Sequence, residues 1–273
     1  MKLLSKYVVA VIACSTVFSP IARANGLDDI KSRGTLICGV MSNVEPFGFQ
    51  DPSTRQLQGY DVDFCNAIAK SLHVKPELKA VSLEARIPEL TQGRVDILAA
   101  ILGWNPSRAE QIDYSDTYFV SQQRVAVIAS SSYKQPTDLA GKRVSVIKGA
   151  STPAFLKRAV PTAETVSYDD TPSAVMALVQ HKVEGAGMSE TILRRFVAKL
   201  GPSGDLKVIS PSLGEEPWGL GIRKGEPELQ KAVNAALQEM EKSGEAQRIF
   251  DKWLGPKSVY DMKREFHVEP IKG

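Results

Sequence analysis

The sequence is poor in the residues that build metal sites and nucleic-acid interfaces. Its three histidines (His73, His181 and His267) are scattered with no metal-site spacing, whereas zinc sites need clustered ligands. Lysine and arginine form no run or tail that would track a nucleic-acid backbone. We therefore expect no metal and no nucleic-acid partner.

Catalytic and cofactor motifs are missing too. Residues 185–190 form a G-x-G turn that lacks the third glycine of G-x-G-x-x-G, so they do not predict a dinucleotide site. The G-x-S-x-G turn of serine hydrolases does not occur. The sequence therefore predicts a protein that needs no cofactor and is not an enzyme.

The one long apolar segment lies at the N-terminus. Lys2 and Lys6 give it a positive start, residues 7–18 are mostly apolar, and residues 22–24 match an A-x-A cleavage site. The apolar part is too short to cross a bilayer as a helix. We expect residues 1–24 to be a signal peptide that directs export.

Cleavage after Ala24 changes the charge balance. The removed segment carries three of the 34 basic residues and no acid, which leaves 31 basic and 31 acidic residues in the mature chain. We expect a soluble, periplasmic protein without net charge. Residues 11–14 also loosely resemble a lipobox, so a lipid anchor at Cys14 is the alternative.

Apolar segments of strand length and helix length alternate along the mature chain. This alternation is typical of a mostly parallel sheet with helices on both faces. Strands are expected at 36–40, 75–81, 95–101, 124–129, 144–147, 183–188 and 219–222. Helices are expected at 62–72, 85–92, 173–180, 191–200 and from 227 onward.

Three short segments match sequence motifs of a known family. Residues 59–63 (GYDVD) open the first long helix, residues 138–142 (DLAGK) precede a strand, and residues 243–246 (SGEA) interrupt the last helical region. Together they resemble the amino-acid-binding family of periplasmic solute-binding proteins. Asp61 and Asp63 stand at a helix entrance, where we expect them to cap free N–H groups.

The resemblance implies an α/β fold of two lobes, the type II periplasmic-binding-protein fold, in which mostly parallel sheets are flanked by helices. Lobe 1 would comprise residues 25–128 and 222–273, and lobe 2 would comprise residues 129–221. Two hinge crossovers are expected, near 126–130 and 219–223. In such sheets a ligand binds beyond the carboxyl ends of the strands.

Two cysteines remain after cleavage. Cys38 lies in an expected strand and Cys65 on the apolar face of the following helix. Because a strand packs on the helix that follows it, and some family members carry cysteines at matching places, we expect a disulfide in the oxidising compartment. Two inert buried thiols are the alternative.

Arg108 is the first candidate ligand-binding residue. The strand before it ends at Ile101, which we also expect to contact the ligand, and leads to a helix entrance where we expect Asn105 to be the cap. In the family, the arginine at this position holds the ligand's α-carboxylate with two parallel hydrogen bonds, a geometry to which guanidinium is suited. A surface ion pair with Asp113 or Asp116 is the alternative.

Arg86 is the second candidate. Residues 85–88 resemble a segment of the glutamate/aspartate-binding branch, in which the arginine reaches the side-chain carboxylate of the ligand. A solvated arginine at a helix start is the alternative. If both arginines bind the ligand, the ligand is acidic or polar.

A third candidate site opens lobe 2. Residues 148–152 follow a strand and begin a helix, where exposed N–H groups favour an anion. The family places hydroxyl residues there; this chain has Ala150 and Ser151. The alternative role of Ser151 is simple N-capping of the helix.

Three positions depart from the family pattern. Ser189, followed by Glu190, stands where many members hold the ligand ammonium with an aspartate. Gly103 replaces a hydroxyl residue, and Val44 replaces an aromatic that stacks on the ligand. Glu190 or Glu45 is the expected replacement for the missing carboxylate. The departures put a standard α-amino acid in doubt, though not a small ligand.

The resemblance implies a monomeric, exported protein that captures a polar or acidic amino acid, or a related small carboxylate, between two lobes. It would deliver this ligand to the membrane subunits of an ABC importer. One alternative is a dehydratase on the same fold, with Glu190 or Glu45 as the acid–base group. Another is a sensor subunit for a membrane kinase.

Overall fold

The computed structural model describes residues 26–272. The predicted signal peptide, its cleavage site at Ala24 and the alternative anchor at Cys14 lie outside the described residues. Within the described range, no helix combines the length and apolarity that a bilayer crossing requires.

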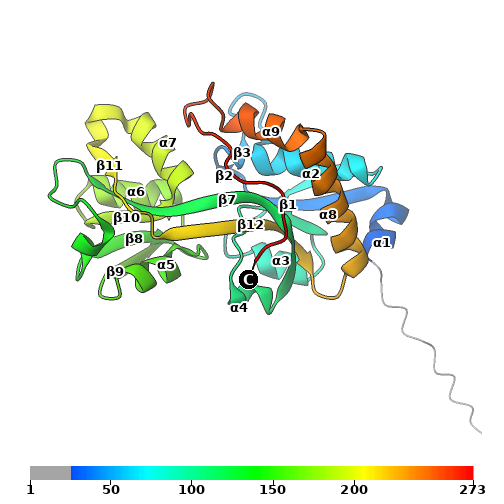
Figure 1. Ribbon diagram of the computed structural model, residues 1–273, viewed down its shortest axis with the longest axis horizontal. Helices are drawn as coiled ribbons and strands as arrows, with labels where there is room; N and C mark the ends of the chain where they lie inside the picture. The colour runs from blue at the N-terminus through cyan, green and yellow to red at the C-terminus, as the bar shows by residue number, and fades with distance from the viewer. Residues whose placement is uncertain (1–25, 273) are drawn as a thin grey trace, which may run out of the picture.

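A nine-stranded sheet runs through the molecule (Figure 1). Its strand order is β5 (Lys75–Ala80), β1 (Thr35–Val40), β6 (Ile97–Ala99), β12 (Gly214–Arg223), β7 (Ile112–Ile128), β10 (Gly185–Ser189), β8 (Arg143–Ile147) and β9 (Glu164–Tyr168), with β11 (Leu206–Val208) paired to β7 outside this path. Neighbours are parallel at both ends of the order, while β12 and β7 in the middle are antiparallel to the strands beside them. A small second sheet contains β2 (Asn43–Val44), β3 (Gly48–Gln50) and β4 (Leu57–Gln58).

Helices flank this sheet in two groups, which confirms the expected two-lobed α/β class. One group is α1 (Gly26–Arg33), α2 (Tyr60–Ser71), α3 (Arg86–Thr91), α4 (Pro106–Ala109), α8 (Pro227–Lys242) and α9 (Glu245–Trp253). The other is α5 (Thr152–Ala159), α6 (Thr171–Val179) and α7 (Glu190–Leu200), with 3-10 turns at Pro136–Leu139 and Gly201–Gly204. The C-terminal helices α8 and α9 pack against α2, so the chain returns to its first lobe (Figure 1).

The long strands β7 and β12 belong to both lobes. Ile112 of β7 pairs with Arg223 of β12, whereas Ala126 of β7 pairs with Ala186 of β10. Figure 1 shows both strands passing from one lobe into the other. They therefore connect the two lobes, and the hinge positions and the lobe boundaries at residues 128 and 221 stay a prediction.

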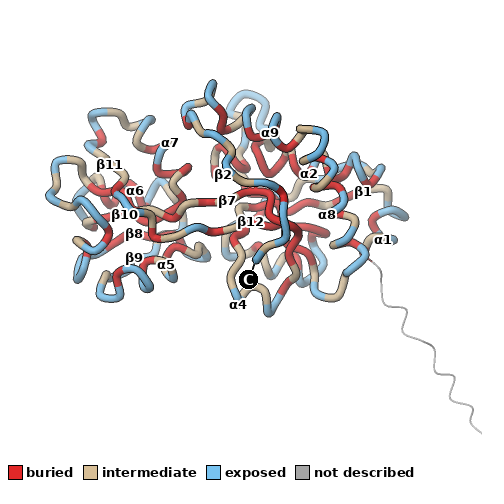
Figure 2. Tube along the Cα trace, in the orientation of Figure 1, coloured by how far each residue is buried: buried red, intermediate tan, exposed pale blue. Residues whose placement is uncertain are grey.

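The core continues from the lobes into these connecting strands. Figure 2 shows buried residues along β7 and β12 where they leave lobe 1. Phe47 packs there against Tyr60, Phe119 and Trp218 with ring centroids 6.0, 5.1 and 4.8 Å away. Aromatic edge contacts of this kind stabilise a core beyond the area they bury.

The entrance of α2 corrects one prediction. Gly59 has a φ of +139°, and a Cβ there would lie 2.1 Å from the carbonyl oxygen of Phe47, so only glycine fits. The carbonyls of Pro46 and Phe47 accept the N–H groups of Tyr60 and Asp61. The carbonyl of Gly59 accepts the N–H of Asp63. The N–H groups of Tyr60, Asp61 and Asp63 thus have backbone acceptors, and no side-chain cap is formed.

The two acids of that first turn make tertiary contacts instead. Asp61 is buried and accepts hydrogen bonds from the Tyr118 hydroxyl at 2.7 Å and the Ile101 N–H at 2.9 Å. Asp63 accepts from Lys252 and Trp253 of α9. The expectation that Asp61 and Asp63 cap the helix was therefore wrong.

The expected disulfide is confirmed. Cys38 of β1 and Cys65 of α2 are bonded, with their Cα atoms 6.4 Å apart and both residues buried. The bond ties the first strand of lobe 1 to the helix that covers it.

Candidate functional site

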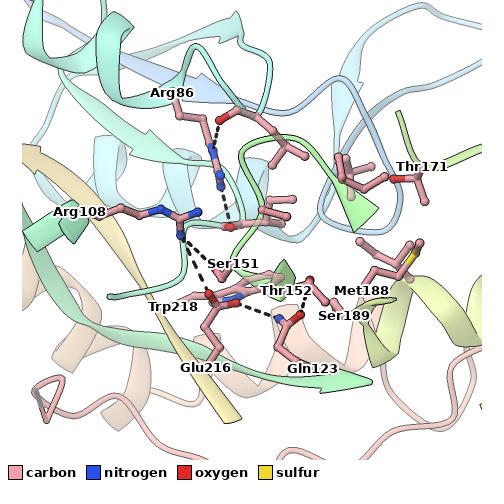
Figure 3. Close-up of a pocket in the computed structure, with 16 residues that line it drawn as sticks. Arg86, Arg108, Gln123, Ser151, Thr152, Thr171, Met188, Ser189, Glu216 and Trp218 are labelled. Carbon is pink, nitrogen blue, oxygen red and sulfur yellow. Dashed lines mark hydrogen bonds and ion pairs between the residues drawn. The ribbon is translucent and has the colours of Figure 1, made fainter. Parts of the chain in front are cut away.

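A cavity lies between the two lobes, bounded by residues from both lobes and from β7 and β12 (Figure 3). The empty space there, counted together with the open solvent at its mouth, is about 480 Å³. Seven of the predicted ligand-binding residues line it, namely Val44, Arg86, Ile101, Arg108, Ala150, Ser151 and Ser189. Two, Gly103 and Glu190, are not among its lining residues.

Arg108 spans the cavity from lobe 1 to lobe 2. Asn105 caps α4 by accepting the Arg108 N–H at 2.9 Å, which fixes the backbone. The Arg108 Nη1 donates to the Gly103 carbonyl at 2.7 Å and to the Ser151 hydroxyl at 3.0 Å. Its Nη2 donates to the Gly149 carbonyl at 2.8 Å. Three of its five N–H donors are thus engaged, and Nε–H and one Nη2–H make no hydrogen bond within the described residues.

The alternative role of Arg108 as a surface ion pair does not match the structure. Asp113 pairs with Lys224 at 3.0 Å, and Asp116 accepts a hydrogen bond from Gln238 at 2.8 Å. Arg108 is directed into the cavity instead.

Arg86 begins α3 and is only 2% exposed, so it is not a solvated surface residue. Its guanidinium donates to the carbonyls of Leu83 (2.9 Å), Ala100 (2.9 Å), Ile101 (2.8 Å) and, across the cavity, Gly149 (3.0 Å). Burial, assisted by the nearby charge of Arg108, lowers the pKa of Arg86 to about 9, so it stays charged at neutral pH.

The segment after β6 is held in an unusual conformation. Ile101 has a φ of +47°, a region that costs roughly 1 kcal/mol for a residue with a Cβ. Asp61 accepts its N–H, and Arg86 donates to its carbonyl. Two buried charged groups therefore fix the turn that leads to Arg108.

Ser151 does not act as a helix cap. It precedes α5 in helical conformation, and its side chain makes no capping hydrogen bond. Its hydroxyl instead accepts from Arg108. The prediction that Ser151 caps the helix is therefore wrong, because its hydroxyl faces lobe 1 rather than its own helix.

Glu216 is the cavity residue that the sequence analysis missed. It lies on β12 and is only 4% exposed. Its Oε2 accepts from the Gln123 amide at 2.9 Å and from the Trp218 indole at 2.9 Å, whereas Oε1 has no hydrogen-bond partner in the described chain. Oε1 lies 4.0 Å from the Arg108 Nη1. The signal was a charged residue two positions before Trp218, on the same face of a strand.

Gly103 is explained by Glu216. A Cβ at position 103 would lie 1.9 Å from the Glu216 Oε1. The carboxylate therefore occupies the space that a side chain at position 103 would need.

The expected replacements for the missing carboxylate lie elsewhere. Glu190 is ion-paired with Arg124 and Arg194, both at 2.7 Å. Burial alone would raise the pKa of Glu190, but the hydrogen bonds from the two arginines together lower it. Glu45 pairs with Arg195 of α7. Glu190 is therefore absent from the cavity lining, and its carboxylate is already ion-paired.

Ser189 itself faces the cavity. It is 6% exposed, and its hydroxyl has no hydrogen-bond partner in the described part of the chain. Register places it beside Gln123 of β7. The remaining wall is apolar and includes Val44, Ile147, Met188 and Ile192. A small molecule with an apolar body and polar ends fits this lining.

Two lobes joined by two strands, with a partly apolar cavity and charged groups between them, define a small-molecule binding protein of the type II two-lobed class. Residues 36–256 match the bacterial extracellular solute-binding proteins, family 3. The chain belongs to this family.

Curated relatives span nearly the whole chain. The chain is 30% identical to the L-cystine-binding protein TcyJ of Escherichia coli (strain K12) over 249 residues, which are 90% of this chain and 92% of that protein. It is 26% identical to the ABC transporter glutamine-binding protein GlnH of Bacillus subtilis (strain 168) over 237 residues, 85% of this chain and 86% of that one.

A solved structure extends the comparison. The ancestral amino acid-binding protein AncCDT-1, described as a precursor of cyclohexadienyl dehydratase, superposes with a TM-score of 0.76 at 30% identity. The match covers 85% of this chain and all (100%) of that chain. The relatives named here are binding proteins.

Proposed function

We propose that this protein binds an amino acid between its two lobes and delivers it to an ABC importer. The observation that carries the proposal is the convergence of Arg108 and Ser151, from opposite lobes, on one enclosed cavity. The family and the curated relatives, which bind glutamine or cystine, support the same class of ligand.

Arg108 is the proposed receptor for the ligand's α-carboxylate. Its Nε–H and remaining Nη2–H point the same way from a planar guanidinium, the arrangement that takes both oxygens of a carboxylate. Ser151 adds a hydroxyl from lobe 2, so a carboxylate bound here contacts both lobes. Contacts with both lobes favour the closed arrangement by mass action.

The contacts of Arg86 argue against the prediction that it binds an acidic side chain of the ligand. Four of its five N–H donors bind backbone carbonyls, including Gly149 of lobe 2. We therefore assign Arg86 to holding the lobes and the turn at Ile101. The apolar wall favours an amino acid with an uncharged side chain over glutamate or aspartate.

The mature protein, residues 25–273, would act as a monomer in the periplasm after removal of the signal peptide. An enzymatic role is not proposed. Glu190 and Glu45, the candidate acid–base groups, are each paired with arginine outside the cavity lining. A general acid needs a raised pKa, whereas the pKa of Glu190 is lowered.

The test is a thermal-unfolding screen of ligand-stripped mature protein against the twenty L-amino acids and L-cystine. A ligand at 100 times its Kd stabilises the native state by about 2.7 kcal/mol, a clear rise in Tm. The Arg108→Ala variant should weaken binding of the best ligand about 100-fold, because a charge-assisted bidentate contact is lost.

Arg94→Ala is the matched control, because Arg94 is a half-exposed arginine of lobe 1 paired with Glu89 outside the cavity. It should bind like the parent. Equal affinity of Arg108→Ala and the parent would overturn the assignment of Arg108, and no shift with any amino acid would overturn the function.

A further inference from the structure

We infer that Glu216 binds the α-ammonium group of the ligand, so the cavity selects zwitterionic amino acids over carboxylates that lack an amino group. This inference deepens the proposed function and rests on it. It begins from an oxygen atom of a residue that lines the cavity: the Glu216 Oε1 is buried and has no donor among the described residues.

The carboxylate of Glu216 is fixed by hydrogen bonds to one of its two oxygens. Gln123 and Trp218 both donate to Oε2, and Gln123 is itself fixed because its Oε1 accepts the Thr152 hydroxyl at 2.8 Å. Figure 3 shows Arg108, Glu216, Gln123 and Thr152 linked in a row along the cavity floor. A carboxylate held through one oxygen presents the other in a fixed place.

That remaining oxygen calls for a positively charged donor. A buried carboxylate oxygen without a hydrogen bond is costly. Arg108 is too far away to supply one, because the separation of 4.0 Å exceeds hydrogen-bond length. Within the described residues no side chain donates to it, and it lies against Gly103, which has no side chain.

The spacing from Arg108 fits an α-amino acid. The ammonium nitrogen of such a ligand is two bonds from its carboxylate carbon, so a carboxylate on Arg108 brings the nitrogen within a few ångströms of the guanidinium. Glu216 Oε1 stands at that distance from Arg108. Ser189, which neighbours Gln123 in the sheet and whose buried hydroxyl is also unpaired, can accept a second ammonium hydrogen.

The charges of the cavity agree with this assignment. Its ionisable lining residues are Arg86, Arg108 and Glu216. With Arg86 engaged by carbonyls, one cation and one anion remain for the ligand. A zwitterion complements both, whereas a simple carboxylate brings a second negative charge beside Glu216 and leaves Arg108, 4.0 Å away, as the nearest cation.

The experiment compares Glu216→Gln with Glu215→Gln by titration calorimetry. Glu215 is the neighbouring acid, exposed and hydrogen-bonded to Gln122, so its variant makes the same change in net charge outside the cavity. The probes are the tightest binder from the panel of amino acids and the same molecule without its amino group (for L-glutamine, 4-carbamoylbutanoate).

The parent should prefer the amino acid over its analogue about 30-fold or more, the loss typical of truncating one partner of a buried charge pair. Glu216→Gln should lose that preference, binding the amino acid about 30-fold more weakly and the analogue within about 3-fold of the parent. Glu215→Gln should match the parent for both probes.

A merely structural role for Glu216 would weaken binding of both probes equally, which would overturn the inference. So would a Glu216→Gln protein that keeps the parent's preference, and both results would leave the proposed function standing. If the parent binds no amino acid of the panel, the inference and the proposed function fall together. Urea unfolding of each unliganded variant checks that it folds.

Discussion

Asp61 connects the first long helix to the ligand cavity through one side chain. Its carboxylate accepts from Tyr118 and from the N–H of Ile101, whose carbonyl receives Arg86. Burial raises the pKa of Asp61 to about 6, although these hydrogen bonds oppose the shift. The acid of the GYDVD segment therefore positions the turn before Arg108 rather than capping a helix.

The raised pKa predicts a pH dependence of stability. The ordinary pKa of 3.8 applies to the unfolded chain and about 6 to the folded one, so between these values the folded state binds more protons. The contribution of Asp61 is then fully present below about pH 4 and is lost as pH rises through about 6, by roughly 3 kcal/mol. Urea unfolding of parent and Asp61→Asn between pH 4 and 7 measures it.

Asp61→Asn removes the titrating group while its oxygen can still accept from Tyr118. The free energy of unfolding of the parent, relative to the variant, should fall across this range of pH. Parallel profiles for the two proteins would contradict the assignment.

Single residues differ in how well the sequence predicts them. Arg108 and Ser151 could be placed because they stand in short segments whose order already predicts a strand end or a helix start. Glu216 could not, because its meaning depends on Gln123, 93 residues away in the sequence, and on the glycine at position 103. Contacts between distant segments leave little local pattern.

The strand β1 and the helix α2 form an element pair joined by the Cys38–Cys65 bond, which closes a loop across 27 positions of sequence. A cross-link of that span lowers the conformational entropy of the unfolded chain. Replacing both cysteines by alanine should therefore lower the free energy of unfolding by about 3 kcal/mol. Urea unfolding with and without reductant measures the loss.

Reductant should destabilise the parent to a similar degree and leave the double alanine variant unchanged. A parent that is equally stable before and after reduction would show that lobe 1 gains nothing from the bond.

Among the elements, regular helices and buried strands were predictable and the connecting strands were not. The expected strands 124–129 and 219–222 are only the apolar ends of β7 and β12, which extend over Ile112–Ile128 and Gly214–Arg223. The missed portions carry polar residues such as Gln123 and Glu216, which line the cavity. A search for apolar patterns misses a strand where its buried side chains are polar.

At the scale of the whole molecule, the two lobes are held together by a few contacts at the cavity and its rim. Arg86 and Arg108 of lobe 1 both donate to the Gly149 carbonyl of lobe 2. Arg195 of α7 is ion-paired with Glu45 across the rim. The described arrangement is therefore closed, and opening must break these contacts.

The C-terminal segment adds a contact to the connecting strands from outside. The carbonyl of Glu269 accepts the N–H of Thr117 in β7 at 2.7 Å, and Gln238 of α8 donates to the carbonyl of Val268 at 3.3 Å. Figure 1 shows this segment crossing β7 and β12. It therefore adds a contact at the lobe 1 end of β7.

The rim pair Glu45–Arg195 allows closure to be tested without touching the cavity, because neither residue lines it. Binding is coupled to closure, so a repulsive pair at the rim should raise the Kd of the identified amino acid. Glu45→Arg or Arg195→Glu alone should raise the Kd about 3- to 5-fold at low salt, the range of a partly exposed ion pair.

The double charge swap should restore parental affinity. In 0.5 M salt all differences in Kd should shrink, because exposed charges are screened beyond roughly 4–5 Å there. Titration calorimetry of the four proteins gives the coupling; single reversals with parental Kd at low salt would show that the rim contact plays no part in closure.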